Sequence, residues 1–289
     1  MRMKSLLTIM FIGVCGYVSA QAGLSVVNDG LRFCESTLPY NNGILIANFG
    51  TENLNPLNDE GKGYIMYYKD GKTETFIPTD GNLSAPKGML AQGDRLFVCD
   101  VNKIVVYSTV NKTSKPVVIR LPEGHLFVND LVADGKYLYA SVTNSDRIFR
   151  IDISGDKGYT PEEWLKVPGP NGLLINNGSM YVASYPADGN TTGKNVIYKI
   201  GDMANPKLEK FVDIAGQYDG IATSTDGNYI YITNWAPASV SKVSLSDRSV
   251  APVNISLDSP LIGPADISVK EGYIYIPDLP NSRVIVVKE

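Results

Sequence analysis

The sequence predicts an all-β fold, a six-bladed β-propeller with four antiparallel strands in each blade. One pattern occurs six times along the 289 residues: a polar residue opens a short strand, a glycine-bearing turn follows, and a second strand alternates apolar and aromatic residues. The repeats begin 42 to 52 residues apart, close to the length of a four-stranded blade. Helical periodicity is nearly absent, which favours the all-β assignment.

The repeats align on the residue that opens the first strand of each. These opening positions are Glu35, Lys87, Asn129, Asn171, Asp219 and Ala265. The turns that follow carry Gly43, Gly93, Gly135, Gly178, Gly227 and Gly272. Tight hairpins tend to need residues with positive φ, and glycine adopts positive φ at little steric cost. Each of these glycines is therefore predicted to have a positive φ.

Two further strand-like runs follow each hairpin, and in the third repeat they cover Arg147–Ile151 and Glu163–Val167. The last repeat shows only three such runs before the chain ends, whereas Leu24–Val27 precedes the first repeat. We expect Leu24–Val27 to supply the outer strand of the sixth blade, because this pairing closes the ring and covers an open edge. No low-complexity linker divides the repeats, so residues 21–289 form one predicted domain.

The first twenty residues resemble a signal peptide. Positive charge near the start precedes an apolar run, and Val18–Ala20 offers a cleavage point before Gln21. The apolar run is too short for a membrane span. The sequence therefore predicts a periplasmic or secreted protein. The alternative is a lipoprotein anchored through Cys15, although the residues before that cysteine fit a lipidation motif poorly.

Composition argues against several classes of partner. The chain has 26 Lys and Arg against 30 Asp and Glu, a net charge of −4, and no basic patch. Binding to nucleic acid or to anionic membranes therefore has little support. The mature chain keeps Cys34 and Cys99, and an exported pair is able to form a disulfide. We favour two separate buried side chains, because two cysteines do not make a disulfide framework.

The topology of a blade predicts that the six opening positions meet near the axis. The first strand of each blade is innermost, so its opening residue lies at one mouth of the central channel. Two acids and two amides converge there, and buried charges are costly unless they are paired or bound to a metal. Oxygen donors without thiolate or imidazole suit a hard cation, so the sequence predicts a site for Ca²⁺ or another divalent cation. The residues next to the opening positions are Ser36, Gly88, Asp130, Gly172, Gly220 and Asp266.

Two alternatives to a metal site stay open at this point. Asp-Gly and Asn-Gly pairs are common in turns, so each of these pairs taken alone fits a turn. Lys87 also belongs to the ring, and its ammonium group is able to neutralise the acids without any metal.

The ordered set of motifs resembles the gluconolactonase and regucalcin (senescence marker protein) family, which is related to the paraoxonases and diisopropyl-fluorophosphatase. The resemblance covers nearly the whole mature chain and rests on Glu35, Asn129-Asp130, Pro170-Asn171-Gly172 and Asp219-Gly220, one per blade and in that order. In such proteins the matching residues hold a catalytic or regulatory divalent ion, usually calcium. The resemblance thus implies a metal site made by Glu35, Asn129, Asn171 and Asp219.

The resemblance also implies a reaction, the metal-assisted hydrolysis of a lactone or ester. The ion would polarise the carbonyl oxygen of a small-molecule substrate and stabilise the oxyanion that develops. Asp219 is the predicted general base, with a purely ligating role as the alternative. Asn129 is expected to contact the substrate as well as the ion.

Three positions depart from the family pattern. His125 is the single histidine, so it cannot form the histidine dyad of paraoxonase-like catalysis, and we expect it on the rim. Phe127 stands where regucalcin-type proteins place an arginine, which puts sugar-lactone binding in doubt. Lys87 is predicted to replace that charge and bind an anionic group of the substrate, with pairing to Glu35 as the alternative.

The mouth of the channel is predicted to carry two long loops. They follow the second strands of blades one and four and run over Phe49–Lys62 and Tyr185–Lys194. These blades face each other across a six-fold ring, so the loops form either a cleft over the site or tolerated insertions. Trp235 follows the second strand of blade five, where it stacks on a substrate or caps the core.

Two functions of different classes follow. The first is an exported calcium-dependent hydrolase of a lactone or ester. The second is a non-catalytic propeller that binds a ligand or protein partner around a structural ion, because one fold hosts many functions. A strictosidine-synthase-like enzyme is disfavoured, since it needs an axial glutamate in a largely apolar pocket and the ring is polar. The sequence has no P-loop, no metal-binding histidine pair and no convincing nucleophile elbow.

Overall fold

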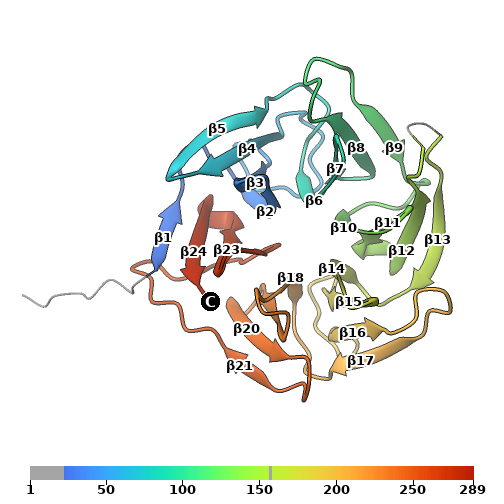
Figure 1. The fold of residues 1–289 in the computed structure, drawn as a ribbon, viewed down its shortest axis with the longest axis vertical. Coiled ribbons are helices and arrows are strands. Elements are labelled where there is room, and N and C mark those ends of the chain that lie inside the picture. Colours follow the sequence, from blue (N-terminus) through green and yellow to red (C-terminus); the bar gives the residue numbers. More distant parts are fainter. Residues whose placement is uncertain (1–22, 156–157) are drawn as a thin grey trace, which may run out of the picture.

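The computed structural model describes residues 23–155 and 158–289, which form six four-stranded antiparallel sheets arranged around a central axis (Figure 1). This arrangement confirms the predicted six-bladed β-propeller. The predicted signal peptide, residues 1–20, and the alternative lipid anchor Cys15 lie outside the described residues. Within the described part, no helix is long and apolar enough to cross a membrane.

Each blade is described from its innermost strand outward. Blade one contains β2 (Cys34–Tyr40), β3 (Gly43–Asn48), β4 (Tyr64–Lys69) and β5 (Lys72–Ile77). Blade two contains β6 (Pro86–Gln92), β7 (Arg95–Asp100), β8 (Lys103–Ser108) and β9 (Val117–Arg120). Blade three contains β10 (Val128–Asp134), β11 (Tyr137–Val142), β12 (Arg147–Asp152) and β13 (Pro161–Lys166).

The second half of the ring repeats this order. Blade four contains β14 (Pro170–Asn176), β15 (Ser179–Ser184), β16 (Ile197–Ile200) and β17 (Leu208–Val212). Blade five contains β18 (Tyr218–Thr223), β19 (Tyr229–Asn234), β20 (Ser239–Ser244) and β21 (Val250–Pro252). Blade six contains β22 (Ser268–Lys270), β23 (Tyr273–Asp278), β24 (Arg283–Lys288) and β1 (Leu24–Val27). Single-turn 3-10 helices follow β11 and β23, namely η1 (Thr143–Ser145) and η2 (Leu279–Asn281).

The ring closes through blade six, as predicted. The N-terminal strand β1 pairs antiparallel with β24 and forms the outer edge of that blade, beside the C-terminal end of the chain (Figure 1). A second link lies at the axis, where Ser36 and Asp266 form a parallel bridge and the Asp266 N–H donates to the Glu35 carbonyl at 3.0 Å. Strand β22 is short and excludes Ala265, which the repeat alignment placed in the first strand. Two chain segments far apart in sequence thus hold the first and last blades together.

The hydrophobic core is divided among the six contacts between neighbouring blades. One cluster, for example, joins Phe97 and Ile104 of blade two to Leu138 and Phe149 of blade three. Five other clusters occupy the remaining contacts. This distribution follows from the strand period of two, because each strand buries side chains on both faces of its blade. A small seventh cluster, which includes Phe49 and Ala265, lies at the axis.

The hairpin turns follow the prediction in five blades. Gly93, Gly135, Gly178, Gly227 and Gly272 all have positive φ, between 58° and 79°. The prediction is wrong for Gly43, which opens β3 and lies outside the positive-φ region. Asn41 adopts φ 48° in that turn instead. Asparagine tolerates the left-handed region better than most residues, so this hairpin needs no glycine at its centre.

The two cysteines of the described chain are free and buried, as the favoured interpretation expected. Cys34 lies at the start of β2, and its Sγ contacts the Arg283 carbonyl at 3.2 Å. Cys99 belongs to the cluster between blades two and three. The two side chains therefore act as small apolar groups of different blade contacts.

Candidate functional site

A cavity of about 90 Å³ lies on the axis, and the opening residues form its floor. Its polar lining residues at these positions are Glu35, Lys87, Asn129, Asn171 and Asp219. Five blades thus contribute side chains to one point, as the repeat alignment predicted. The sixth position, Ala265, packs in the axial apolar cluster instead.

Local strand geometry aims these side chains at the axis. In each of the five strands the pairing register shifts at the opening position, between Cys34 and Ser36 in β2 and between Val128 and Leu131 in β10. The same shift occurs in β6, β14 and β18. Such irregularities bend a strand and re-aim a side chain out of the ladder. The floor residues are therefore placed by backbone irregularities rather than by flexible loops.

The backbone just before the opening positions is held by polar residues that end the second strand of the same blade. Asp100 Oδ1 accepts the N–H groups of Ser84 at 3.0 Å and Ala85 at 2.6 Å. Asn48 and Asn234 accept backbone N–H groups in blades one and five. Hydrogen bonds to a buried carboxylate are stronger than those between neutral groups. These contacts therefore hold the backbone in position where the inner strand begins near the axis.

The neighbours of the opening residues form a second ring that joins adjacent blades. Asp130 accepts the N–H of Leu131 at 2.7 Å in its own blade and that of Leu173 at 2.6 Å in blade four. Asp266 accepts a hydrogen bond from the hydroxyl of Ser36 at 2.8 Å. At the equivalent position of blade five, a Cβ on Gly220 would collide with the backbone of blade six. Only glycine fits there, because the two inner strands approach too closely for any side chain.

The floor differs from the second ring because it leaves oxygen atoms without partners. Eight buried side-chain nitrogen or oxygen atoms in the described chain have no hydrogen-bond partner, and half of them lie in this cavity. Those four are Glu35 Oε2, Asn129 Oδ1, Asn171 Oδ1 and Asp219 Oδ1. Buried polar atoms are normally satisfied, so four orphans at one point indicate a missing partner.

The chemistry of these four atoms fits a hard divalent cation. Two carboxylates and two amide oxygens are ligands of the kind that Ca²⁺ accepts, with further oxygens needed to complete six to eight. No three His, Cys, Asp or Glu side chains of the described residues gather as a metal-binding group, so half of the donors must be amides. Asn129 and Asn171 are thus as necessary to such a site as Glu35 and Asp219.

Burial gives the floor acids unusual proton affinities. Burial, with the charge of Asp219, raises the pKa of Glu35 well above its usual range. Burial and the charge of Asp130 raise the pKa of Asp219 to about 7. A hydrogen bond from Asn171 and the charge of Lys87 act in the opposite direction and lower this pKa. The Asn171 amide lies 3.4 Å from Asp219 Oδ2. Asp219 is therefore able to hold or accept a proton near neutral pH.

Lys87 makes different contacts from those that the sequence suggested. Its side chain is 1% exposed, and its ammonium group donates to the carbonyls of Pro56 at 2.9 Å and Ala85 at 3.0 Å. The rings of Phe49 and Phe127 lie 5.4 and 5.2 Å from its Nζ. The alternative interpretation, pairing with Glu35, is not supported, since no ion pair joins these two described residues. Binding of an anionic substrate group by Lys87 stays a prediction. Burial lowers the pKa of Lys87, although the nearby charge of Glu35 opposes this effect.

The wall of the cavity is aromatic and apolar, which the sequence did not predict. Its residues are Phe49, Pro56, Phe127, Tyr185, Trp235 and Leu279. The polar ring that disfavoured a strictosidine-synthase-like site is therefore found only on the floor, whereas the wall above it is apolar. The repeat carried a usable signal, because Phe49, Tyr185, Trp235 and Leu279 each directly follow the second strand of their blade. Leu279 was not predicted, because the segment after β23 is short and only the long loops and Trp235 were expected at the mouth.

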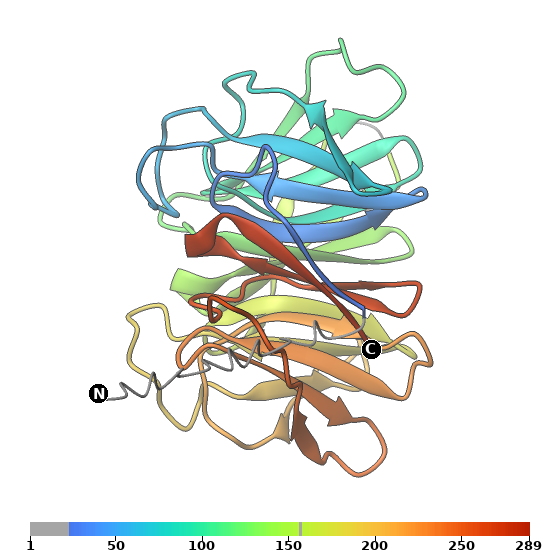
Figure 2. The same cartoon turned by 90° about the vertical axis from the view of Figure 1, so that its left-hand side faces the viewer.

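The two long loops lie on the mouth side of the ring, as predicted. Figure 2 shows them projecting from the same face, the loop of blade one in blue and that of blade four in yellow. The first contributes Phe49 and Pro56 to the wall, and the second contributes Tyr185. Both loops therefore reach the candidate site.

His125 lies outside the lining of this cavity, in agreement with its expected place on the rim. Its Nδ1 is 2.9 Å from the Ser145 hydroxyl, and its ring packs edge-on against Phe149. Phe127, two residues later, lines the cavity with φ 64°. A positive φ is uncommon for a bulky residue and marks a strained position, which is often found at functional sites.

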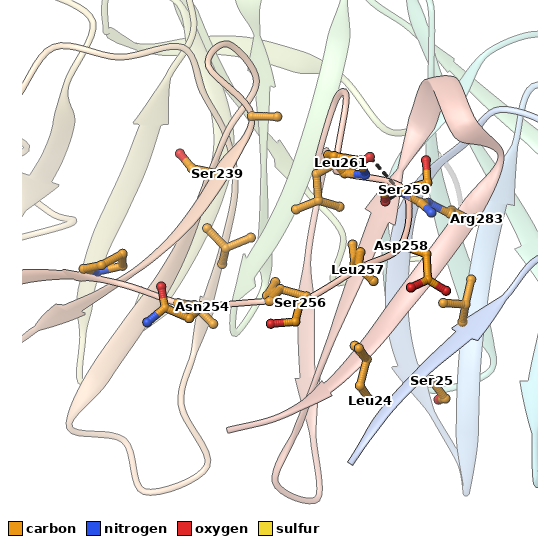
Figure 3. A pocket seen from close by; sticks show the side chains of 17 residues that line it. Leu24, Ser25, Ser239, Asn254, Ser256, Leu257, Asp258, Ser259, Leu261 and Arg283 are labelled. Atoms are coloured by element: carbon orange, nitrogen blue, oxygen red, sulfur yellow. Dashed lines mark hydrogen bonds between the residues drawn. The ribbon is translucent and has the colours of Figure 1, made fainter. Parts of the chain in front are cut away.

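A larger groove of about 1090 Å³ lies between blades five and six, away from the axis (Figure 3). It is lined by residues 252–261 and by β1. Arg283 at its edge is engaged by Asp278 at 2.8 Å and by the carbonyls of Ser259 and Pro260. Among the described residues that line the groove, Asp258 is the single acid and none is a histidine or cysteine, so the axial cavity is the better candidate for chemistry.

The chain matches no protein-family model, and no curated protein matches it in sequence. Solved structures do resemble it. A gluconolactonase of Xanthomonas campestris superimposes with a TM-score of 0.65, covering 92% of this chain and 89% of its own at 12% identity. A catalytically inactive virginiamycin B lyase of Staphylococcus aureus, solved with quinupristin, gives 0.57 over 92% and 99% at 16% identity. A chain of the nidogen–laminin complex gives 0.61 over 79% and 86% at 13% identity.

These similarities concern the fold. The resemblance to the gluconolactonases is confirmed at that level. At 12 to 16% identity the neighbours do not decide the chemistry of this chain, because propellers host both enzymes and binding modules.

Proposed function

We propose that this protein is an exported hydrolase of a lactone or ester that depends on a divalent cation, Ca²⁺ by preference. The cation would be held by Glu35, Asn129, Asn171 and Asp219. One observation carries the proposal, namely the four buried oxygens of these residues that have no partner on the cavity floor. The fold shared with a gluconolactonase supports the class of reaction.

The residues of the floor suit the separate tasks of such a reaction. When bound, the cation supplies a Lewis acid for the carbonyl oxygen of the substrate. Asp219, whose pKa is raised to about 7, takes the proton from an attacking water. Asn171 donates to Asp219 Oδ2 and orients that carboxylate. The aromatic wall limits the access of other water, which strengthens electrostatic interactions on the floor.

Cation binding and catalysis are tested together. Protein stripped with a chelator is titrated calorimetrically with Ca²⁺, Mg²⁺, Mn²⁺ and Zn²⁺, and a panel of lactones and esters is then assayed with and without each cation. We expect binding of one Ca²⁺ and hydrolysis that is lost on chelation and restored by Ca²⁺. The Asp219→Asn variant should lower kcat by about 100-fold or more, in line with the loss of a general base.

The matched control is Asp134→Asn, which makes the same change at an exposed acid on β10 and should leave kcat unchanged. Hydrolysis that survives both chelation and Asp219→Asn would exclude the proposed mechanism. Absence of cation binding would exclude the metal site.

A second candidate is a non-catalytic propeller that binds a ligand or protein around a structural cation. Two features favour it: Phe127 stands where regucalcin-type proteins place an arginine, and no histidine is among the described residues that line the cavity. A similar fold occurs in a chain of the nidogen–laminin complex. Cation binding without turnover of any ester or lactone would favour this candidate.

Export is part of the proposal and has its own test. We propose that residues 1–20 are removed and that the mature protein begins at Gln21 in the periplasm or medium. N-terminal sequencing of the exported protein checks this directly. A mature chain that begins at a lipid-modified Cys15 would replace export of a soluble form with lipid anchoring.

A further inference from the structure

The wall of the axial cavity offers little to a hydroxylated molecule. Of its six side chains, only Tyr185 and Trp235 carry a polar atom. Phe49, Phe127 and Leu279 present only carbon. A hydroxyl group placed against such a surface loses its hydrogen bonds to water without gaining new ones, which disfavours binding of a polyol.

This wall is a fixed part of the ring. The backbone N–H of Phe49 donates to the Phe33 carbonyl at 3.1 Å, and that of Tyr185 donates to Gly169 at 2.7 Å. Trp235 and Leu279 make the equivalent bonds at 2.8 and 3.0 Å. Each bond ties a wall residue to the backbone two residues before an opening position. The apolar surface is therefore preorganised above the polar floor.

Lys87 contacts three residues of the wall and holds them in position. Its hydrogen bond to the Pro56 carbonyl holds the long loop of blade one over the cavity. The rings of Phe49 and Phe127 flank its ammonium group at 5.4 and 5.2 Å. With these contacts, Lys87 orders two aromatic side chains as well as a loop.

Apolar side chains continue from the wall onto the rim. Leu57 follows the wall residue Pro56 and is 39% exposed, and Leu126 precedes Phe127 and is 38% exposed. Ile262, at 56%, precedes Gly263, where an added Cβ would collide with the Trp235 ring. Three exposed apolar residues thus border one mouth, on segments that the blade topology places on the same face.

The size of the cavity limits what it encloses. Its volume of about 90 Å³ is smaller than the roughly 150 Å³ of a protein cavity that holds benzene. The floor and wall accommodate one small group, such as a carbonyl and its nearest carbons. A longer hydrocarbon chain extends over the rim, where the exposed apolar residues lie.

We propose that the axial cavity selects an apolar, hydroxyl-poor acyl compound, a lactone or ester with a hydrocarbon chain. Its carbonyl lies on the polar floor and its chain lies across Trp235, Phe127 and the rim. This inference rests on the proposed hydrolase function for the identity of the reacting group. The apolar preference itself rests on the wall and the rim, which are separate from the floor.

The first test compares three six-membered lactones by kcat/KM. Glucono-δ-lactone carries hydroxyl groups, δ-valerolactone carries no substituent, and δ-decalactone carries a five-carbon chain. We expect δ-decalactone to exceed δ-valerolactone by about 10-fold or more, given a gain of roughly fourfold for each methylene group fully buried. We expect glucono-δ-lactone to fall below both. A preference for glucono-δ-lactone would overturn the inference and leave the hydrolase function intact.

Variants locate the effect on the rim. Leu126→Gln should reduce the advantage of δ-decalactone over δ-valerolactone to a few-fold. The matched control is Val110→Gln, since Val110 is 76% exposed and lies between β8 and β9, on the opposite face of the ring from the mouth. An equal effect of both variants, or of neither, would contradict recognition at the rim.

A binding measurement separates recognition from turnover. The chain has two tryptophans, so a Trp164→Phe background leaves Trp235 as the single tryptophan whose emission is followed. This protein is titrated with 3-pentylcyclohexanone, a non-hydrolysable ketone in which a CH2 group replaces the ring oxygen of δ-decalactone, and with glucose as the polyol control. Saturable fluorescence change with the ketone alone supports the inference, even if no ester is hydrolysed and the proposed function fails. No response to the ketone, or a response to glucose, overturns it.

Discussion

Asp219 and Asp130 occupy neighbouring rings around the same axis and differ in one respect. Both carboxylates are buried, and burial raises the pKa of each to about 7. Both oxygens of Asp130 accept backbone N–H groups, one of them from the next blade. Asp219 Oδ1 accepts nothing, although it lines a cavity.

The comparison of Asp219 with Asp130 shows that burial and proton affinity do not by themselves identify a functional acid. Structural ion and hydrogen-bond networks shift pKa values as strongly as active sites do. Here the distinction lies in hydrogen-bond satisfaction. Asp130 completes a joint between blades three and four, whereas Asp219 has capacity left for a ligand. The floor ring is a candidate site, and the second ring is its support.

The largest expected effect is the pH dependence of the metal-free protein. The pKa of Asp219 and of Asp130 is about 7 in the folded protein and about 4 in an unfolded chain. Between these values the folded state binds more protons, so stability is greatest at low pH and falls as pH rises through 7. We expect a loss on the order of 4 kcal/mol between pH 5 and pH 8. Urea denaturation after chelation measures it, and stability that is flat or rising over this range would contradict the burial of uncompensated charge.

Identical substitutions in the two rings should have opposite signs. Asp130→Asn also removes a buried charge, but it replaces one acceptor oxygen by a donor and leaves the Leu131 or Leu173 N–H unpaired, so the net cost should be about 2 kcal/mol. Asp219→Asn removes a buried charge and keeps an acceptor for Asn171, so it should stabilise the metal-free protein by about 1 kcal/mol at pH 8. Chemical denaturation at pH 8 measures the free energy of unfolding of both variants and of the wild-type protein. Equal losses would mean that the two acids are both structural.

A smaller effect is expected from Ca²⁺, which should stabilise the protein through the residues of the floor ring. Saturation with Ca²⁺ at 100 times its Kd should stabilise the wild-type protein by about 2.7 kcal/mol. Asp219→Asn should abolish most of this increment, because one of four donors becomes neutral. Thermal unfolding at a series of Ca²⁺ concentrations gives the increment, with Mg²⁺ for comparison. An unchanged increment in Asp219→Asn would place the cation away from the floor.

Much of the fold was predictable from the sequence because its signals are local. Alternation of period two, turn residues and blade-length spacing recur six times, so an ambiguous repeat is resolved by its neighbours. The closing strand Leu24–Val27 followed from counting strands in the last repeat. The error at Gly43 was also local, since Asn41 fills the same conformational need.

The candidate site was predictable in part. The opening positions have equivalent places in the repeats, so the convergence of Glu35, Asn129, Asn171 and Asp219 followed from topology. The partners of Lys87 did not follow, because its acceptor Pro56 lies in a loop without a repeated pattern.

By itself, the sequence determined the number of blades, the order of strands and the ring of polar residues at the axis, because each depends on chemistry repeated within about 50 residues. The tertiary structure alone decided which buried oxygens lack partners and which side chains enclose them. The wall joins residues from Phe49 to Leu279, brought together only when the ring closes. Hydrogen-bond satisfaction and cavity shape depend on such distances across the ring, and no local pattern encodes them.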